Sequence, residues 1–168
     1  PANFGNLVAG TEPTPLDTSF GTAGGLICYE SIYPYVARED VEAGAEYFLM
    51  VSNDSWFDGS AALRQHLCHA VMRCVENGRD MARAGNTGIS AVISASGTIE
   101  KKSNADAEEV LVSDIVPTTE RTLYSYIGDL IALPLAGLYA FGIFLMIRGF
   151  ILKFIAKKRE KETISHNV

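Results

Sequence analysis

The chain has few cysteines and no pattern that would pair them. Its 168 residues include only Cys28, Cys68 and Cys74, and no two of these stand in a Cys-x-x-Cys arrangement. An odd count without that spacing argues against both a disulfide framework and a thiolate zinc site. His66 and His69 lie three residues apart but have no third ligand beside them. We therefore expect no metal and no cofactor.

Basic residues are scarce in the first part of the chain. Residues 1–128 hold 8 Lys and Arg against 17 Asp and Glu, whereas residues 129–168 hold 6 against 3. Phosphate binding needs clustered Lys and Arg, so an acidic body of this kind excludes nucleic acid as the partner. The opposite charge balance of the two parts indicates that they face different surroundings.

Charge is absent from residues 130–147, whose sequence is LIALPLAGLYAFGIFLMI. An uncharged run of this length is typical of a transmembrane helix, although a buried helix of a globular protein is the ordinary alternative. The basic residues that follow are Lys153, Lys157, Lys158, Arg159 and Lys161. Because positive charge favours the cytoplasmic side, we expect a cytoplasmic C-terminus and residues 1–128 on the opposite side of the membrane.

The remaining sequence alternates strand and helix patterns, which is typical of an α/β fold. Strands are expected at 23–28, 46–52, 88–95 and 110–116, with helices at 31–44 and 60–84. The expected organisation is a catalytic portion over 1–122, a junction over 123–129, a transmembrane helix over 130–155 and a basic tail over 156–168.

Cys28 is the thiol best placed for chemistry. In GGLICYESIYP it stands where an apolar strand gives way to a turn and a helix. Helix-start amides stabilise a thiolate, and the carboxyl end of a strand borders the usual ligand crevice of an α/β sheet. Packing is the alternative, because free cysteines are often buried. Cys68 and Cys74, in the middle of a predicted helix, are expected to be packing residues. Glu30 could orient a neighbour or be an exposed acid of the cap region.

Several stretches together resemble the C-terminal part of the apolipoprotein N-acyltransferases, membrane members of the nitrilase (carbon–nitrogen hydrolase) superfamily. In order along residues 10–129, they are GTEPTPL, GGLICYESIYP, GAEYFLMVSNDSWFDGS, QHLCHAVMRCVENGRDMARAGNTGISAVIS and RTLYSYIGD. The resemblance implies the later half of a nitrilase-like four-layer α-β-β-α sandwich, followed by one C-terminal transmembrane helix.

The resemblance also implies roles for particular residues. Cys28 matches the nucleophile of a Glu-Lys-Cys triad, and Glu30 matches a family acid beside it. The backbone N–H of Tyr29 would help to hold the oxyanion. Substrate contacts are expected from Tyr29 and from four residues of the loop after the second strand: Asn53, Asp54, Trp56 and Phe57. For Trp56 and Phe57, anchoring the loop in the core is the alternative.

The matching Glu and Lys of the triad are not found before Cys28. No Lys precedes it, and the two acids that do, Glu12 and Asp17, do not occupy the general-base motif. We therefore expect a fragment that is inactive by itself; a complete but inactive relative is the alternative.

The implied activity is transfer of a fatty acyl group to a protein amine. The acyl donor would be a phospholipid, and the acceptor the N-terminal α-amine of a diacylglyceryl-cysteine lipoprotein. The implied location is the bacterial inner membrane, with the catalytic domain on the periplasmic side. Two other functions stay open: a membrane-tethered amidohydrolase of the nitrilase type, and a non-catalytic, membrane-anchored α/β docking module.

Overall fold

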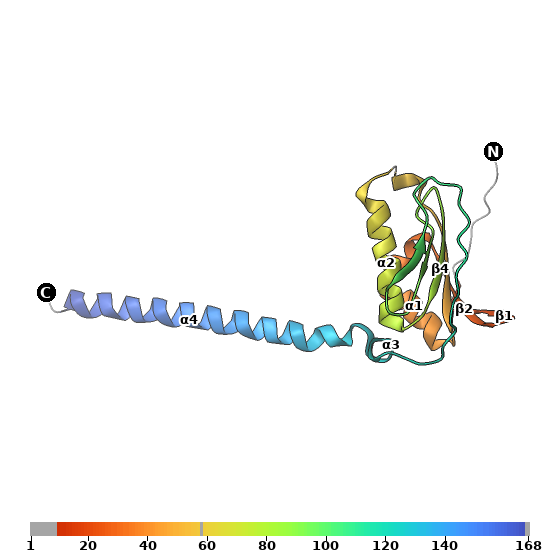
Figure 1. Cartoon of the computed structure of the whole chain (residues 1–168). Coiled ribbons are helices and arrows are strands. Elements are labelled where there is room, and N and C mark those ends of the chain that lie inside the picture. Colours follow the sequence, from red (N-terminus) through yellow and green to blue (C-terminus); the bar gives the residue numbers. More distant parts are fainter. Residues whose placement is uncertain (1–9, 58, 167–168) are drawn as a thin grey trace. The chain divides into compact units, whose positions relative to one another are not determined.

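The computed structural model describes residues 10–57 and 59–166. Backbone contacts divide the chain into two units, residues 1–128 and 129–168, which are described separately. The first unit carries all the strands of the described chain. The second unit is helical (Figure 1).

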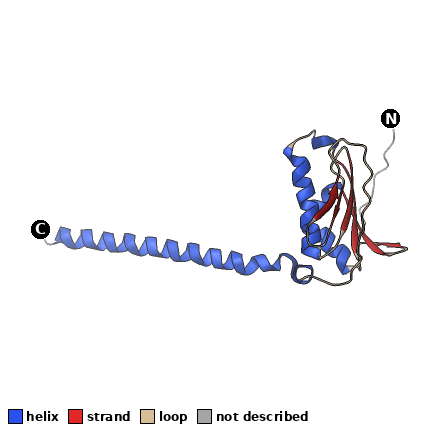
Figure 2. Cartoon of the chain, in the orientation of Figure 1, coloured by secondary structure: helices blue, strands red, loops and turns tan. Residues whose placement is uncertain are grey.

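The first unit is built on one sheet, whose strands are red in Figure 2. The sheet has six strands, which lie in sequence order. The strands are β1 (Leu16–Thr18), β2 (Gly21–Ile27), β3 (Tyr47–Asn53), β4 (Met81–Asn86), β5 (Ala91–Ile93) and β6 (Ile99–Lys102). β2, β3 and β4 are parallel, and the outer pairs are antiparallel. The register aligns Ile27 with Val51 and Asn53 with Asn86, so the three parallel strands end at one edge of the sheet.

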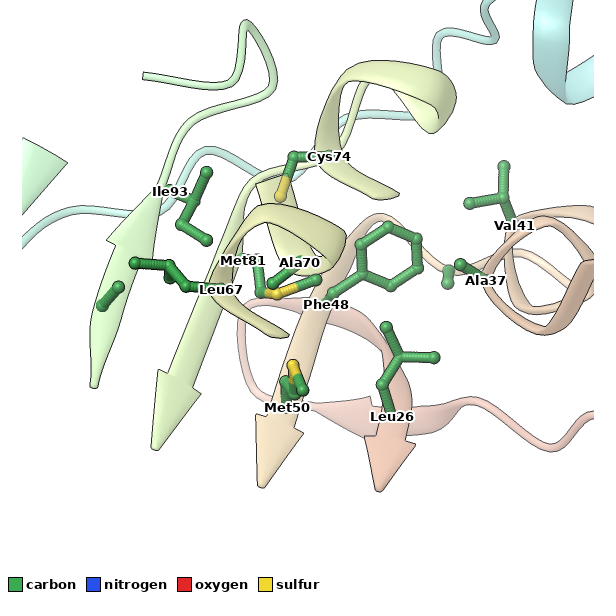
Figure 3. Packing of buried hydrophobic residues seen from close by; sticks show 12 residues of the cluster. Leu26, Ala37, Val41, Phe48, Met50, Leu67, Ala70, Cys74, Met81 and Ile93 are labelled. Carbon is green, nitrogen blue, oxygen red and sulfur yellow. The ribbon is translucent and has the colours of Figure 1, made fainter. Parts of the chain in front are cut away.

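Helices cover one face of this sheet. They are α1 (Pro34–Glu42) and α2 (Ala61–Asn77), with the short helices η1 (Cys28–Ile32), η2 (Ser55–Phe57) and α3 (Leu123–Ile127) beside them. The core between sheet and helices includes Leu26, Phe48 and Met50 from the strands and Val41 and Leu67 from the helices (Figure 3). Burial of these apolar side chains is the main force that holds the layers together.

The opposite face of the sheet carries no helix layer among residues 10–57 and 59–128, although Glu109–Leu111 lines a pocket of about 450 Å³ with Leu49 and Val51 on this side. Burial alternates along β3, so that Phe48 and Met50 are buried while Leu49 and Val51 are exposed. Ile27 of β2 is exposed on the same side, with 63% of its surface accessible. The described unit therefore has one sheet layer and one helix layer, and the other two layers of the expected sandwich stay a prediction.

One helix end and one strand differ from the sequence-based expectation. The helix expected to reach residue 84 ends at Asn77, because Gly78 adopts the left-handed conformation (φ 63°) and caps it. The chain then forms β4, which pairs with β3. Residues 110–116 are not a strand: Val112 accepts a bond from the Lys101 side chain and the N–H of Val116 bonds to Asp80, so side chains replace a ladder.

Two further strands also differ. The strand expected at 88–95 is limited to β5, and the charged connector after it contains β6, which pairs antiparallel with β5. Both strands are short; β5 is buried and apolar, whereas β6 at the sheet edge is exposed throughout. A short polar strand such as β6 carries little hydrophobic signal in the sequence.

The second unit contains the helix α4 (Ala132–His166). Pro134 lies in its first turn, where a missing N–H removes no helix hydrogen bond. Among the described residues, one helical stretch, Leu123–Lys153, is long and apolar enough to cross a membrane. This is the stretch in which the sequence predicts a span.

Candidate active site around Cys28

Cys28 lies directly after β2, at the edge where the parallel strands end. It opens the short helix η1 and has a backbone φ of 52°. A residue with a side chain seldom adopts this left-handed conformation, which persists where the surrounding structure holds it. The thiol is half-buried. The sequence-based expectation of a thiol at the strand end is therefore met in position.

An open groove of about 560 Å³ lies in front of this edge and includes Cys28 in its lining. The groove is bordered by the ends of β2, β3 and β4, through Ile27, Cys28, Val51, Ser52, Asn53, Trp56, Ala84, Gly85, Asn86 and Ser90. Three residues predicted from the sequence, Cys28, Asn53 and Trp56, thus come together here. The described lining contains no carboxylate, Lys or His, so a proton acceptor for the thiol has to come from elsewhere.

The two aromatic residues of the predicted rim have different environments. The indole of Trp56 is 87% exposed beside the groove, so it does not anchor the loop in the core. Phe57 instead packs its ring against His66, with ring centroids 5.7 Å apart in an edge-on arrangement. Tyr29 lies against the same two rings at 6.3 and 6.1 Å. Phe57 therefore fixes the loop, and Trp56 is free to contact a ligand.

Glu30 caps a strand edge. Its carboxylate accepts a hydrogen bond of 2.7 Å from the backbone N–H of Ile27. β1 pairs only with residues 21–23 of β2, which leaves this part of β2 without a ladder partner on that side. Glu30 also lines a second pocket of about 400 Å³ together with Glu12, Glu39 and Asp40. Burial, aided by the charges of Glu30 and Glu39, raises the pKa of Asp40 to about 6.

Asp54 lies inside the protein and not in the groove. It is 1% exposed, and its carboxylate contacts Arg83 at 2.6 Å, the hydroxyl of Ser52 at 2.5 Å and His66 Nδ1 at 2.9 Å. Burial lowers the pKa of Arg83, and the charge of Asp54 opposes that shift. This placement argues against the substrate contact expected for Asp54, because the carboxylate is enclosed by protein groups.

The site residues expected from the sequence did not include His66 or Arg83, which the structure places in this region. Both are buried, at 3% exposure each. His66 lies on α2 and Arg83 on β4, a strand that the sequence pattern does not reveal. A polar residue at a position of the buried helix face was the available signal for His66.

The other cysteines differ from each other. Burial, aided by the charge of Asp80, raises the pKa of Cys74 to about 12, which fits the expected packing role. Cys68 is exposed and does not pack, contrary to expectation, because it faces away from the sheet. Within the described residues, no three His, Cys, Asp or Glu side chains are grouped so as to hold a metal ion.

Comparison with known proteins adds the family context. The family model for carbon–nitrogen hydrolases matches residues 4–124. An apolipoprotein N-acyltransferase of Geobacter metallireducens is 35% identical over 131 residues, which is 78% of this chain and 25% of that protein. The corresponding protein of Haemophilus influenzae is 34% identical over 132 residues, 79% of this chain and 24% of its own. This chain thus spans about a quarter of the length of these curated relatives.

Among solved structures, a carbon–nitrogen hydrolase of Helicobacter pylori matches with a TM-score of 0.54 at 20% identity. The match covers 60% of this chain and 42% of that one. At this identity the likeness concerns the fold alone. It agrees with the mixed α/β fold of the first unit, which matches part of that structure.

Proposed function

Because this chain belongs to the carbon–nitrogen hydrolase family, we propose that Cys28 is the nucleophile of an apolipoprotein N-acyltransferase. The observation that carries the proposal is the position of Cys28: a half-buried thiol with φ 52° at the end of a parallel strand, opening into a groove. The identity of about 35% to curated acyltransferases supports the same activity.

The reaction would proceed in two steps through a thioester. The Cys28 thiolate attacks the ester carbonyl of a phospholipid, a C–S bond forms, the ester C–O bond breaks, and the lysophospholipid leaves as its alcohol after taking up a proton. The α-amine of the diacylglyceryl-cysteine then attacks the thioester. A C–N bond forms, the C–S bond breaks, and a base accepts the proton of the amine.

This chain would supply the nucleophile and part of the groove. The N–H of Tyr29 is the proposed donor to the oxyanion, and Trp56 and Asn53 are proposed to border the acyl chain. No Lys precedes Cys28, so the Lys and the general-base Glu would come from a part of the protein outside this sequence. By itself, the chain would therefore not turn over.

A membrane location would suit this chemistry, because both substrates are amphiphiles held in the bilayer. The proposed arrangement has the span in the inner membrane, the catalytic unit on the periplasmic side and the basic tail in the cytoplasm. Binding enzyme and substrates to one surface raises their local concentration.

The test uses the complete protein that carries this sequence, purified in detergent and mixed with a phospholipid and a diacylglyceryl peptide. Mass spectrometry should find an acyl group on Cys28 when the peptide is omitted, and an N-acylated peptide when it is present. Cys28→Ala should abolish both products, whereas Cys68→Ala, which removes an exposed thiol outside the groove, should retain them. Free fatty acid as the only product would instead identify a hydrolase. Unchanged function of Cys28→Ala would identify a non-catalytic module.

A further inference from the structure

The backbone carbonyl of Cys28 is held by two side chains. Ser31 Oγ donates a hydrogen bond to it at 3.0 Å, and His66 Nε2 lies 3.1 Å from it. Ser31 is fully buried and comes from η1 itself, whereas His66 comes from α2, 38 positions further along the chain. A carbonyl oxygen only accepts, so Nε2 of His66 donates to it when it carries a hydrogen; without one, Nε2 accepts from Ser31 Oγ, which lies 3.1 Å away and itself holds the same carbonyl.

The ring of His66 is fixed from its other side. Its Nδ1 lies 2.9 Å from Asp54 Oδ1, and the second carboxylate oxygen of Asp54 accepts a hydrogen bond from Arg83. Ser52 donates a further bond to Asp54. Since all of these side chains are buried, each can change its orientation only by breaking a hydrogen bond that water cannot replace.

The strained residue and the network meet at the same carbonyl. Cys28 has φ 52°, a conformation that persists only where the surroundings determine it. Changing φ to the ordinary negative range rotates the direction of the side chain relative to β2. The groups that fix the carbonyl therefore also fix where the sulfur points.

We propose that His66 is a positioning residue, which holds Cys28 in the left-handed conformation and so directs its sulfur into the groove. Asp54 and Arg83 orient His66 for this task. That the aimed sulfur is a nucleophile rests on the proposed function; that His66 aims it does not.

Two substitutions of His66 separate the two ring nitrogens. His66→Gln places an amide N–H close to the position of Nε2 and can still donate to Cys28, whereas His66→Asn places its amide near Nδ1 and cannot. His69→Gln, on the exposed side of the same helix, is the matched control. All variants are made in a Cys68→Ser background, and each is assayed at the same interval below its own melting temperature. Under this condition, a role in stability alone would give the same result for Gln and for Asn.

In the complete protein, His66→Asn is expected to lower kcat about 10- to 100-fold with little change in KM, as for a misdirected reacting group. His66→Gln should recover most of this loss. Independently of activity, the rate of Cys28 alkylation by iodoacetamide, followed by peptide mass, should fall about tenfold in His66→Asn and be restored in His66→Gln. His69→Gln should behave as the parent.

Equal effects of Gln and Asn, or no effect of either, would overturn the proposal. If His66→Asn does not fold, Ser31→Ala, which removes the other donor, should still slow alkylation; an unchanged rate there would also overturn it. If the parent protein transfers no acyl group, the proposed function fails, while the alkylation rates still decide the role of His66.

Discussion

Arg83 and Asp54 form an ion pair of 2.6 Å in which both side chains are completely buried. Asp54 follows β3 and Arg83 lies on the neighbouring strand β4, so the pair links the loop after β3 to the sheet. Removal of one partner would leave the other charge buried without compensation.

Asp54→Asn is expected to destabilise the protein by about 3–5 kcal/mol for that reason. Arg38→Ala is the contrast, because its pair with Glu42 is partly exposed and should contribute less than about 1 kcal/mol. Urea unfolding of the protein in detergent measures both. Similar losses for the two variants would contradict this account of the buried pair.

Gly78→Ala should cost more than Gly59→Ala, although both glycines have left-handed φ values, 63° and 67°. Each substitution introduces the strain of a side chain in this conformation, about 1–2 kcal/mol. At Gly78 the new methyl group would also lie 2.9 Å from the side chain of Thr122, whereas at Gly59 it would meet nothing within 4 Å. The difference between the two unfolding free energies reports the clash, and a difference of zero would show that Thr122 moves aside freely.

As the pH rises from about 4 to about 6, the free energy of unfolding should fall because of Asp40. Its pKa is about 6 in the folded protein against 3.8 for the free group, so the folded state retains a proton that the unfolded chain has lost. The folded form is therefore favoured at low pH and loses this advantage as the pH rises through that range. Asp40→Asn cannot ionise and should be more stable than the parent at pH 7.5, by up to about 3 kcal/mol, but not at pH 4.

The control for that experiment is Glu100→Gln, which neutralises an exposed carboxylate on β6. Unfolding free energies at the two pH values should shift equally in Glu100→Gln and in the parent. A pH-independent effect of Asp40→Asn would mean that folding does not raise the pKa of this carboxyl.

Cys68 and Cys74 should react very differently with iodoacetamide at pH 8. Cys68 is exposed, whereas burial raises the pKa of Cys74 to about 12 and encloses its sulfur. Peptide mapping should find Cys68 labelled and Cys74 unmodified until guanidinium unfolds the protein. Equal labelling under native conditions would show that α2 does not pack on the sheet as described.

The uncovered sheet face should make the isolated chain bind hydrophobic dyes and unfold over a broad temperature range. Leu49 and Val51 are exposed there; the segment 109–111 lies beside them, but among residues 10–57 and 59–128 no helix covers them as helices cover the other face. Replacing both by Gln should lower dye fluorescence, and Val116→Gln, exposed elsewhere, should not. A sharp cooperative transition without dye binding would contradict this prediction.

Much of the sheet could be predicted because its central strands are apolar runs. β3 carries a contiguous hydrophobic run, Tyr47–Val51, and β2 ends in the apolar pair Leu26 and Ile27 after small residues, which favours buried parallel strands. β4 could not be predicted, since Met81–Asn86 is short, contains Arg83 and continues the periodicity of α2. For the site, Cys28 was identifiable from its place at a strand end, but the burial of Asp54 was not.

Three features could be read from the amino-acid sequence alone: the thiol at a strand end, the charge difference between the two parts of the chain and the long apolar stretch. These features are local, because each depends on neighbouring residues only. The groups that surround that thiol depend instead on how the chain folds. His66 and Cys28 are 38 positions apart and Arg83 and Asp54 are 29, and residues so distant meet only when the packing of α2 and the pairing of β3 with β4 bring them together.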